Sequence, residues 1–180
     1  VRLEAQRSLT PPEFAELLAI RDRLPPSAQP WLDEISALGR FAERDVAGFA
    51  RRTLGPNADL YGDPALPKER KRLIIGFAGI SQQLMLPAPC VLQFLAPRKC
   101  DVVLLRDPDR QQFHRGVRDY APTFLDVLAR VRTDVPFAGY RRVFTFGTSM
   151  GAVSALRAGL LLGVHRAVAV GARMPWPGPR

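Results

Sequence analysis

The residues best suited to chemistry in this sequence run from Gly147 to Gly151 and read Gly-Thr-Ser-Met-Gly. They follow the alternating apolar stretch 143–146 and begin a segment, 150–162, that is typical of a helix. A serine on a sharp strand-to-helix turn presents its hydroxyl above a sheet, and flanking glycines let such a turn form. The helix start also directs free backbone N–H groups toward negative charge. We therefore predict that Ser149 is a nucleophile; the alternative is a tight turn that happens to contain a serine.

Such a serine needs a base to accept its proton and an acid to orient that base. After Ser149 the sequence has no Asp or Glu, and its one later histidine, His165, is expected at the opposite end of the sheet. His114 and Asp107 belong to the loop 106–118, which is expected on the same side as Ser149. A catalytic triad of these three residues is chemically reasonable, because a triad is recognised by geometry and not by order. The alternative is a surface loop in which Asp107 forms a turn.

Strands and helices alternate from residue 72 onward. Continuous apolar runs predict buried strands, and amphipathic segments predict the helices between them. The predicted strands are 73–78, 102–105, 143–146 and 167–170, and the predicted helices are 87–95, 119–131 and 150–162. This alternation indicates the α/β class, with a parallel sheet and helices on both faces. Ligands of such sheets bind beyond the carboxyl ends of the strands, so the loops after the strands are expected to meet around one binding site.

Residues 1–67 differ from the rest of the chain and read as helices broken by proline. Thr10 is predicted to cap a first helix, and a second helix is predicted over residues 31–54. The stretch 55–67 is rich in Gly, Pro, Asn and Asp and is expected to be a linker. We therefore divide the chain into a helical N-terminal segment, 1–67, and an α/β core, 68–180. The N-terminal segment is either a lead-in that packs beside the sheet or a lid.

Two motifs carry a resemblance to a known family. The turn at 147–151 is similar to the nucleophile elbow of the α/β-hydrolase superfamily, and Phe-Ala-Gly-Ile at 77–80 occupies the place of that family's oxyanion loop. Residues 72–175 thus resemble the central part of the superfamily, preceded here by the helical segment.

The resemblance implies specific roles. Ser149 would be the nucleophile, Gly147 and Gly151 the glycines of the elbow, and the backbone N–H groups of Met150 and Ile80 the oxyanion donors. In the family an acid and then a histidine follow the serine, and this sequence departs from that pattern. We therefore expect that the chain is a fragment, that another segment completes the site, or that the protein binds without turnover.

Two functions from different classes remain open at this point. The first is a serine hydrolase-like, esterase-like protein that acts on a small-molecule substrate with an ester, thioester or similar acyl group. The second is a non-catalytic module of the same fold that binds a ligand or a protein partner. The predicted edge strand 167–170 carries little charge, so we expect a partner or a missing segment to cover it.

Composition excludes several other classes of protein. The 180 residues are 47% hydrophobic and 24% charged, which is typical of a globular domain. No apolar run is long enough to cross a membrane, and no secretory leader is evident, so we expect a cytoplasmic protein without a membrane partner. The net charge is +9, but the arginines are scattered and no aromatic residues alternate with them, so nucleic acid is not expected. Cys90 and Cys100 lack metal-site spacing; no metal and no cofactor are expected, and both thiols should be reduced.

Overall fold

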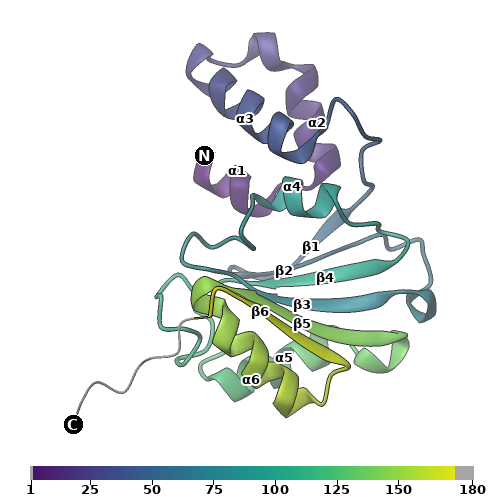
Figure 1. The fold of residues 1–180 in the computed structure, drawn as a ribbon, viewed down its shortest axis with the longest axis vertical. Helices are drawn as coiled ribbons and strands as arrows, with labels where there is room; N and C mark the ends of the chain where they lie inside the picture. The colour runs from purple at the N-terminus through teal and green to yellow at the C-terminus, as the bar shows by residue number, and fades with distance from the viewer. Residues whose placement is uncertain (1, 173–180) are drawn as a thin grey trace.

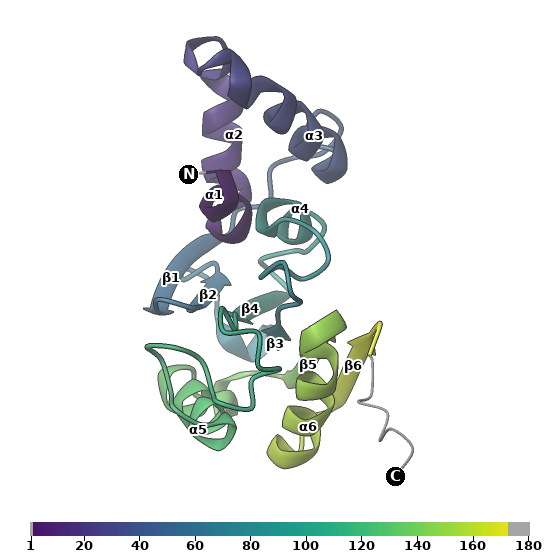
Figure 2. The same ribbon diagram turned by 90° about the vertical axis from the view of Figure 1, so that its left-hand side faces the viewer.

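A six-stranded mixed sheet separates two helical layers (Figures 1 and 2). The structure is a computed structural model and describes residues 2–172. The strands are β1 (Ala50–Gly55), β2 (Ala58–Gly62), β3 (Arg72–Phe77), β4 (Cys100–Leu105), β5 (Arg142–Thr148) and β6 (Arg166–Val170), in the spatial order β1-β2-β4-β3-β5-β6. The last four in the chain are parallel, and β2 is antiparallel to both of its neighbours. The predicted α/β class with a largely parallel sheet is therefore confirmed.

Helices lie on both sides of this sheet. They are α1 (Arg2–Ser8), α2 (Pro11–Ala19), α3 (Gln29–Gly39), α4 (Ala88–Gln93), α5 (Phe124–Asp134) and α6 (Ala152–Leu162). The side of α1 to α4 is opposite that of α5 and α6, as Figure 2 shows. Short 3-10 turns cover Arg21–Arg23, Pro26–Ala28, Lys68–Arg70, Phe137–Gly139 and Ser149–Gly151. Among the helices of residues 2–172, none is long and apolar enough to cross a membrane.

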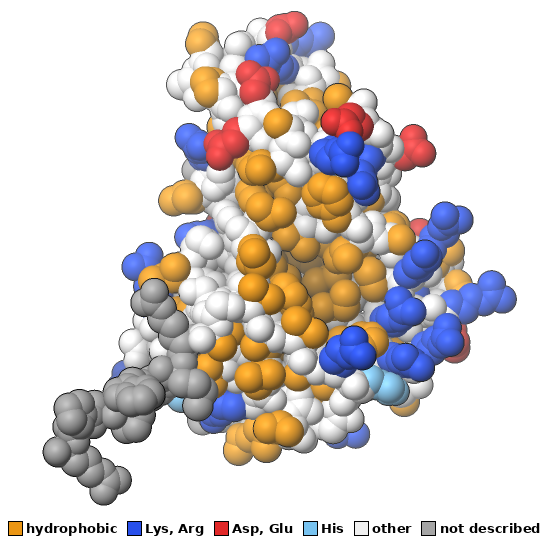
Figure 3. Space-filling model, in the orientation of Figure 1, with side chains coloured by type: hydrophobic (Ala, Val, Ile, Leu, Met, Phe, Trp, Pro, Cys, Tyr) orange, Lys and Arg blue, Asp and Glu red, His pale blue; other side chains and the backbone are white. Residues whose placement is uncertain are grey.

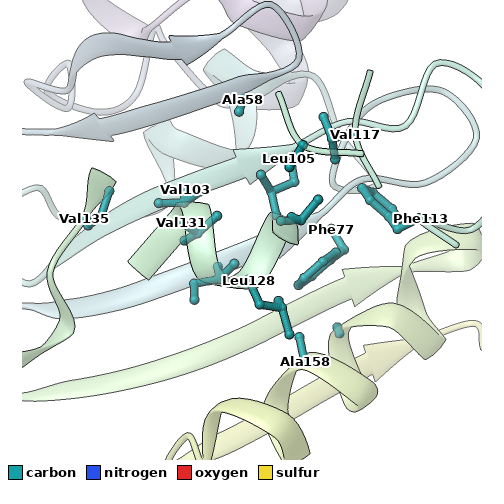
Figure 4. Packing of buried hydrophobic residues seen from close by; sticks show 14 of the residues in the cluster. Ala58, Phe77, Val103, Leu105, Phe113, Val117, Leu128, Val131, Val135 and Ala158 are labelled. Atoms are coloured by element: carbon teal, nitrogen blue, oxygen red, sulfur yellow. The ribbon is translucent and has the colours of Figure 1, made fainter. Parts of the chain in front are cut away.

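The largest core cluster lies between the sheet and the layer of α5 and α6 (Figure 4). Side chains alternate along each strand, so Leu73, Ile75 and Phe77 of β3 all point into this cluster. Val131 of α5 and Ala158 of α6 meet them there. The small residues Ala152, Ala155, Ala158 and Gly159 of α6 are buried, which lets this helix lie close to the sheet.

The N-terminal part differs from the prediction after α3. This helix ends at Gly39, where Arg40 adopts a left-handed backbone conformation with φ 54°. Residues 50–62 form the antiparallel hairpin β1–β2, and β2 pairs with β4. The helix predicted to reach residue 54 and the linker predicted over 55–67 are therefore wrong in this region. Gly55-Pro56-Asn57 is the turn of a hairpin, so the sheet begins at residue 50 and crosses the boundary that was expected at residue 67.

Buried polar contacts fasten the N-terminal helices to the sheet. Thr10 caps α2 within a capping box, as predicted. The guanidinium of Arg106, at the end of β4, donates to the Asp59 carboxylate at 2.6 Å and to the Tyr61 hydroxyl at 3.2 Å. It also donates to the main-chain carbonyl of Arg7 in α1. The hairpin, β4 and α1 are thus joined at one buried cation.

Candidate active site

Ser149 follows the last residue of β5 and begins the 3-10 turn that leads into α6. Its backbone lies in the left-handed region with φ 49°, and its side chain is exposed. A residue with a Cβ atom adopts this conformation at a cost of about 1–3 kcal/mol, so the surrounding structure must impose it.

The two glycines that flank the turn supply that constraint. A Cβ atom on Gly147 would lie 2.3 Å from the Gly151 carbonyl oxygen and 2.7 Å from the Ala155 Cβ atom. A Cβ atom on Gly151 would lie 2.3 Å from the Phe77 carbonyl oxygen at the end of β3. Because each contact involves backbone or a helix on the sheet, neither position tolerates a side chain without displacing α6.

A hollow of about 250 Å³ opens above the turn. The loop after β3 forms one wall of it, through Ile80 and Met85, and the end of β6 forms another through Val170. Gly79 brings the backbone of this loop close to the turn, since a Cβ atom there would lie 3.6 Å from the Ser149 Cβ atom. The strand ends after β3, β5 and β6 therefore meet around an exposed hydroxyl with mostly apolar walls.

Two backbone N–H groups near Ser149 are available as donors. Within residues 2–172 no acceptor is found for the Ile80 N–H. Met150 lies in the first turn of a helix, where N–H groups lack intrahelical acceptors. Their predicted role as oxyanion donors stays a prediction.

The structure does not bring His114 and Asp107 to Ser149. The His114 ring is exposed, and its Nδ1 atom lies 3.2 Å from a guanidinium nitrogen of Arg157 on α6. The Asp107 carboxylate is buried and accepts a hydrogen bond from the Phe113 N–H at 2.9 Å. Neither residue lines the hollow above Ser149. Asp107 here shapes its own loop, and the triad of these three residues stays a prediction.

His165 lies at the far end of the sheet, as expected. Its backbone N–H donates to the Val143 carbonyl at 3.0 Å, next to the start of β5. The Val143 N–H donates to the Nδ1 atom of the ring at 3.4 Å, so the ring lies near the beginning of β5, whereas Ser149 follows the end of that strand.

Gln82 is a residue of this region that sequence reasoning missed. Its side chain is buried, its φ is 64°, and its Nε2 atom donates to the Asp107 carbonyl at 2.9 Å. It thereby links the loop after β3 to the loop after β4, and its Oε1 atom is buried without a partner in the described part of the chain. The one signal in the sequence was a pair of glutamines three residues after Gly79, which matches no known motif.

Both cysteines are free and buried, away from this hollow. Burial raises the pKa of the Cys90 thiol and of the Cys100 thiol to about 11. Both thiols therefore stay protonated near neutral pH, which leaves them poor nucleophiles.

Comparisons with known proteins give similarity in structure alone. No protein-family model and no curated protein sequence matches the chain. The structure is similar to a brefeldin A esterase described as a bacterial homologue of human hormone-sensitive lipase, with 15% identity and a TM-score of 0.43 over 73% of this chain and 41% of that chain. It is similar to esterase B from Lactobacillus rhamnosis, with 18% identity and a TM-score of 0.41 over 80% of this chain and 56% of that chain. It is also similar to a bacterial heroin esterase, with 17% identity and a TM-score of 0.40 over 88% of this chain and 55% of that chain. The chain thus spans about half the length of these solved structures.

Proposed function

We propose that the protein is a serine hydrolase that cleaves an ester or thioester bond through Ser149. The observation that carries this proposal is the backbone of the turn. Ser149 has φ 49° between two glycines at which a Cβ atom would lie 2.3 Å from a carbonyl oxygen. Strained backbone of this kind persists where function or packing demands it, and here it exposes a hydroxyl in a hollow.

In the proposed reaction the Ser149 Oγ atom attacks the acyl carbonyl carbon while a base takes the hydroxyl proton. The N–H groups of Met150 and Ile80 stabilise the oxyanion of the tetrahedral intermediate. The alcohol or thiol then leaves with that proton, and water releases the acid by the same steps in reverse order. The base is either His114, once its ring has left Arg157, or a group outside residues 2–172.

The hollow suits a short acyl group. Its volume of about 250 Å³ is below the range of about 300–1,000 Å³ that holds drug-sized ligands. The side chains of Ile80, Met85 and Val170 would contact an aliphatic chain of a few carbons.

Labelling with a serine-reactive fluorophosphonate tests the proposal. The wild type should be labelled, and Ser149→Ala should abolish the label, because the reagent traps an activated hydroxyl. Ser81→Ala is the matched control, since Ser81 is an exposed serine that lines the same hollow and should not matter. Equal labelling of wild type and Ser149→Ala, with the fold checked by circular dichroism, would contradict the proposal.

A second candidate is a non-catalytic module of the same architecture that binds a ligand. The observation that favours it is that neither histidine of the chain lines the hollow at Ser149. A folded wild type that takes up no label would support this candidate.

A further inference from the structure

Gln82 contacts both peptide groups that flank the Ile80 Cα atom. Its main-chain N–H donates to the Gly79 carbonyl at 2.9 Å, and its side-chain Nε2 atom donates to the Ile80 carbonyl at 3.4 Å. The Gly79 carbonyl and the Ile80 N–H belong to the same planar peptide group, so a bond that fixes the direction of one also fixes the direction of the other. Gln82 therefore sets the orientation of the Ile80 N–H.

The Gln82 side chain also holds this turn against the loop that follows β4. Its Nε2 atom donates to the Asp107 carbonyl in that loop at 2.9 Å. Asp107 is itself held in place, because its buried carboxylate accepts a hydrogen bond from the Phe113 N–H. The turn that contains the Ile80 N–H is thus tied to a second loop whose position is fixed.

Stability does not account for a glutamine at this position. Its side chain is 4% exposed, its Oε1 atom has no hydrogen-bond partner within residues 2–172, and its φ is 64°. A buried oxygen without a partner and a left-handed backbone both cost free energy. The Asp107 carbonyl also accepts the Arg110 N–H at 3.1 Å, so it keeps a partner without the glutamine amide. An apolar side chain of similar size would therefore suit the fold at least as well.

The hydrogen bonds of Gln82 suit a role in the reaction instead. We propose that Gln82 is a positioning residue that holds the Ile80 N–H at the hollow above Ser149, ready for the oxyanion of an acyl substrate. This inference rests on the proposed function, because an oxyanion forms only if Ser149 attacks. Ile80 and Ser149 line the hollow, whereas Gln82 does not and acts through the Ile80 peptide group. Oxyanion donors stabilise the transition state because they are fixed before the charge develops, and removal of one costs about 10²–10³ in rate.

The rate of fluorophosphonate labelling tests this role in the full chain. Gln82→Met keeps the size of the side chain but removes the donor. The maximal rate of labelling at Ser149 should fall by about tenfold or more, because the Ile80 N–H loses its fixed direction. The reagent concentration that gives half this rate should change by less than about threefold, because Gln82 does not line the hollow.

Gln83→Met is the matched control for this variant. Gln83 is the next residue in the chain, and it holds the turn through its main-chain carbonyl, which accepts the Gly79 N–H at 2.9 Å. The same substitution here keeps that bond, so the maximal rate of labelling should equal that of the wild type.

Two further measurements separate positioning from a merely structural role. The urea midpoint of Gln82→Met should equal or exceed that of the wild type, because the substitution removes the unpaired Oε1 atom. Gln82→Glu provides a rescue, because a protonated carboxyl group can donate as the amide does, and burial raises its pKa. Its labelling rate relative to the wild type should rise between about pH 8 and about pH 5, whereas the relative rate of Gln82→Met should stay constant.

The outcomes separate this inference from the hydrolase proposal. If the wild type is labelled and the rate of Gln82→Met lies within about twofold of it, the inference is overturned and the hydrolase proposal stands. A slower Gln82→Met with a lower urea midpoint, and no recovery of Gln82→Glu in acid, also overturns the inference, because the glutamine then serves the fold. A folded wild type that takes up no label overturns both.

Discussion

The two faces of the sheet are built from the same strands but differ in how completely they are covered. On the face of α5 and α6, Leu73, Ile75 and Phe77 of β3 are fully buried. On the opposite face, Ile74 of the same strand is half-buried and lines an apolar depression of about 690 Å³, which Figure 3 shows as an orange hollow. The difference does not come from the composition of the strand centres, because both faces are apolar there. It comes from the helices of residues 2–172: α5 and α6 cover the first face, whereas on the second face α4 packs on β4, and Val168 and Val170 of β6 are each 37% exposed.

The largest expected effect compares two phenylalanines, one on each face. Phe77→Ala should lower the free energy of unfolding by about 3–5 kcal/mol, because it empties a fully buried site. Phe144→Ala, in the apolar depression, should cost at most about 1.5 kcal/mol, since its side chain is only half-buried and its removal leaves no closed cavity. Urea denaturation measures both. Equal costs would mean that the second face is covered in solution as fully as the first.

The second comparison concerns charge. Lys71 is 1% exposed, and its Nζ atom lies 2.9 Å from the Asp101 carboxylate, which also accepts a hydrogen bond from the Tyr140 hydroxyl. Lys71→Met should cost about 3–4 kcal/mol, because it leaves a buried carboxylate without its cation. Arg142→Gln should change the free energy of unfolding by less than about 0.5 kcal/mol, since Arg142 is exposed and forms no ion pair within the described residues. Thermal unfolding of both variants measures this difference. A larger loss of stability in Arg142→Gln than in Lys71→Met would contradict it.

The smallest effect concerns pH and the face that α4 covers. Burial raises the pKa of Cys90, in α4, and of Cys100, in β4, from 9.0 to about 11. A raised pKa in the folded state stabilises the protein below the ordinary pKa, so this contribution is full below pH 9 and is lost between about pH 9 and 11. Urea midpoints should therefore fall over this interval.

A double variant isolates the two thiols in that experiment. Buried Tyr61, Tyr120 and Tyr140 also have raised pKa values, because burial disfavours the phenolate, and their contribution begins to be lost above the ordinary tyrosine pKa of 10.0. The urea midpoint of the double variant Cys90→Ala, Cys100→Ala should therefore fall less steeply than that of the wild type between about pH 9 and 11. An unchanged slope would show that neither thiol is held in the protonated state by burial.

Local patterns in the sequence predicted much of this fold. The apolar runs became β3, β4, β5 and β6, and Thr10 caps α2, because strand burial and helix capping depend on residues close together in the chain. The position of Ser149 between a strand and a helix followed from the same kind of pattern. The hairpin β1–β2 was missed because its turn, Gly55-Pro56-Asn57, has the composition of a linker as well.

What the sequence by itself determined is the order of strands and helices and the glycines around Ser149. The tertiary structure alone decided where the long loops go: His114 lies beside Arg157, and Asp107 binds the Phe113 N–H, so neither side chain meets Ser149. It also decided that Arg72, Arg142 and Arg166, which are far apart in the chain, meet at one apolar depression of the sheet. The physical reason is that periodicity and caps act within a few residues, whereas loop positions and layer coverage depend on contacts between residues far apart in the chain.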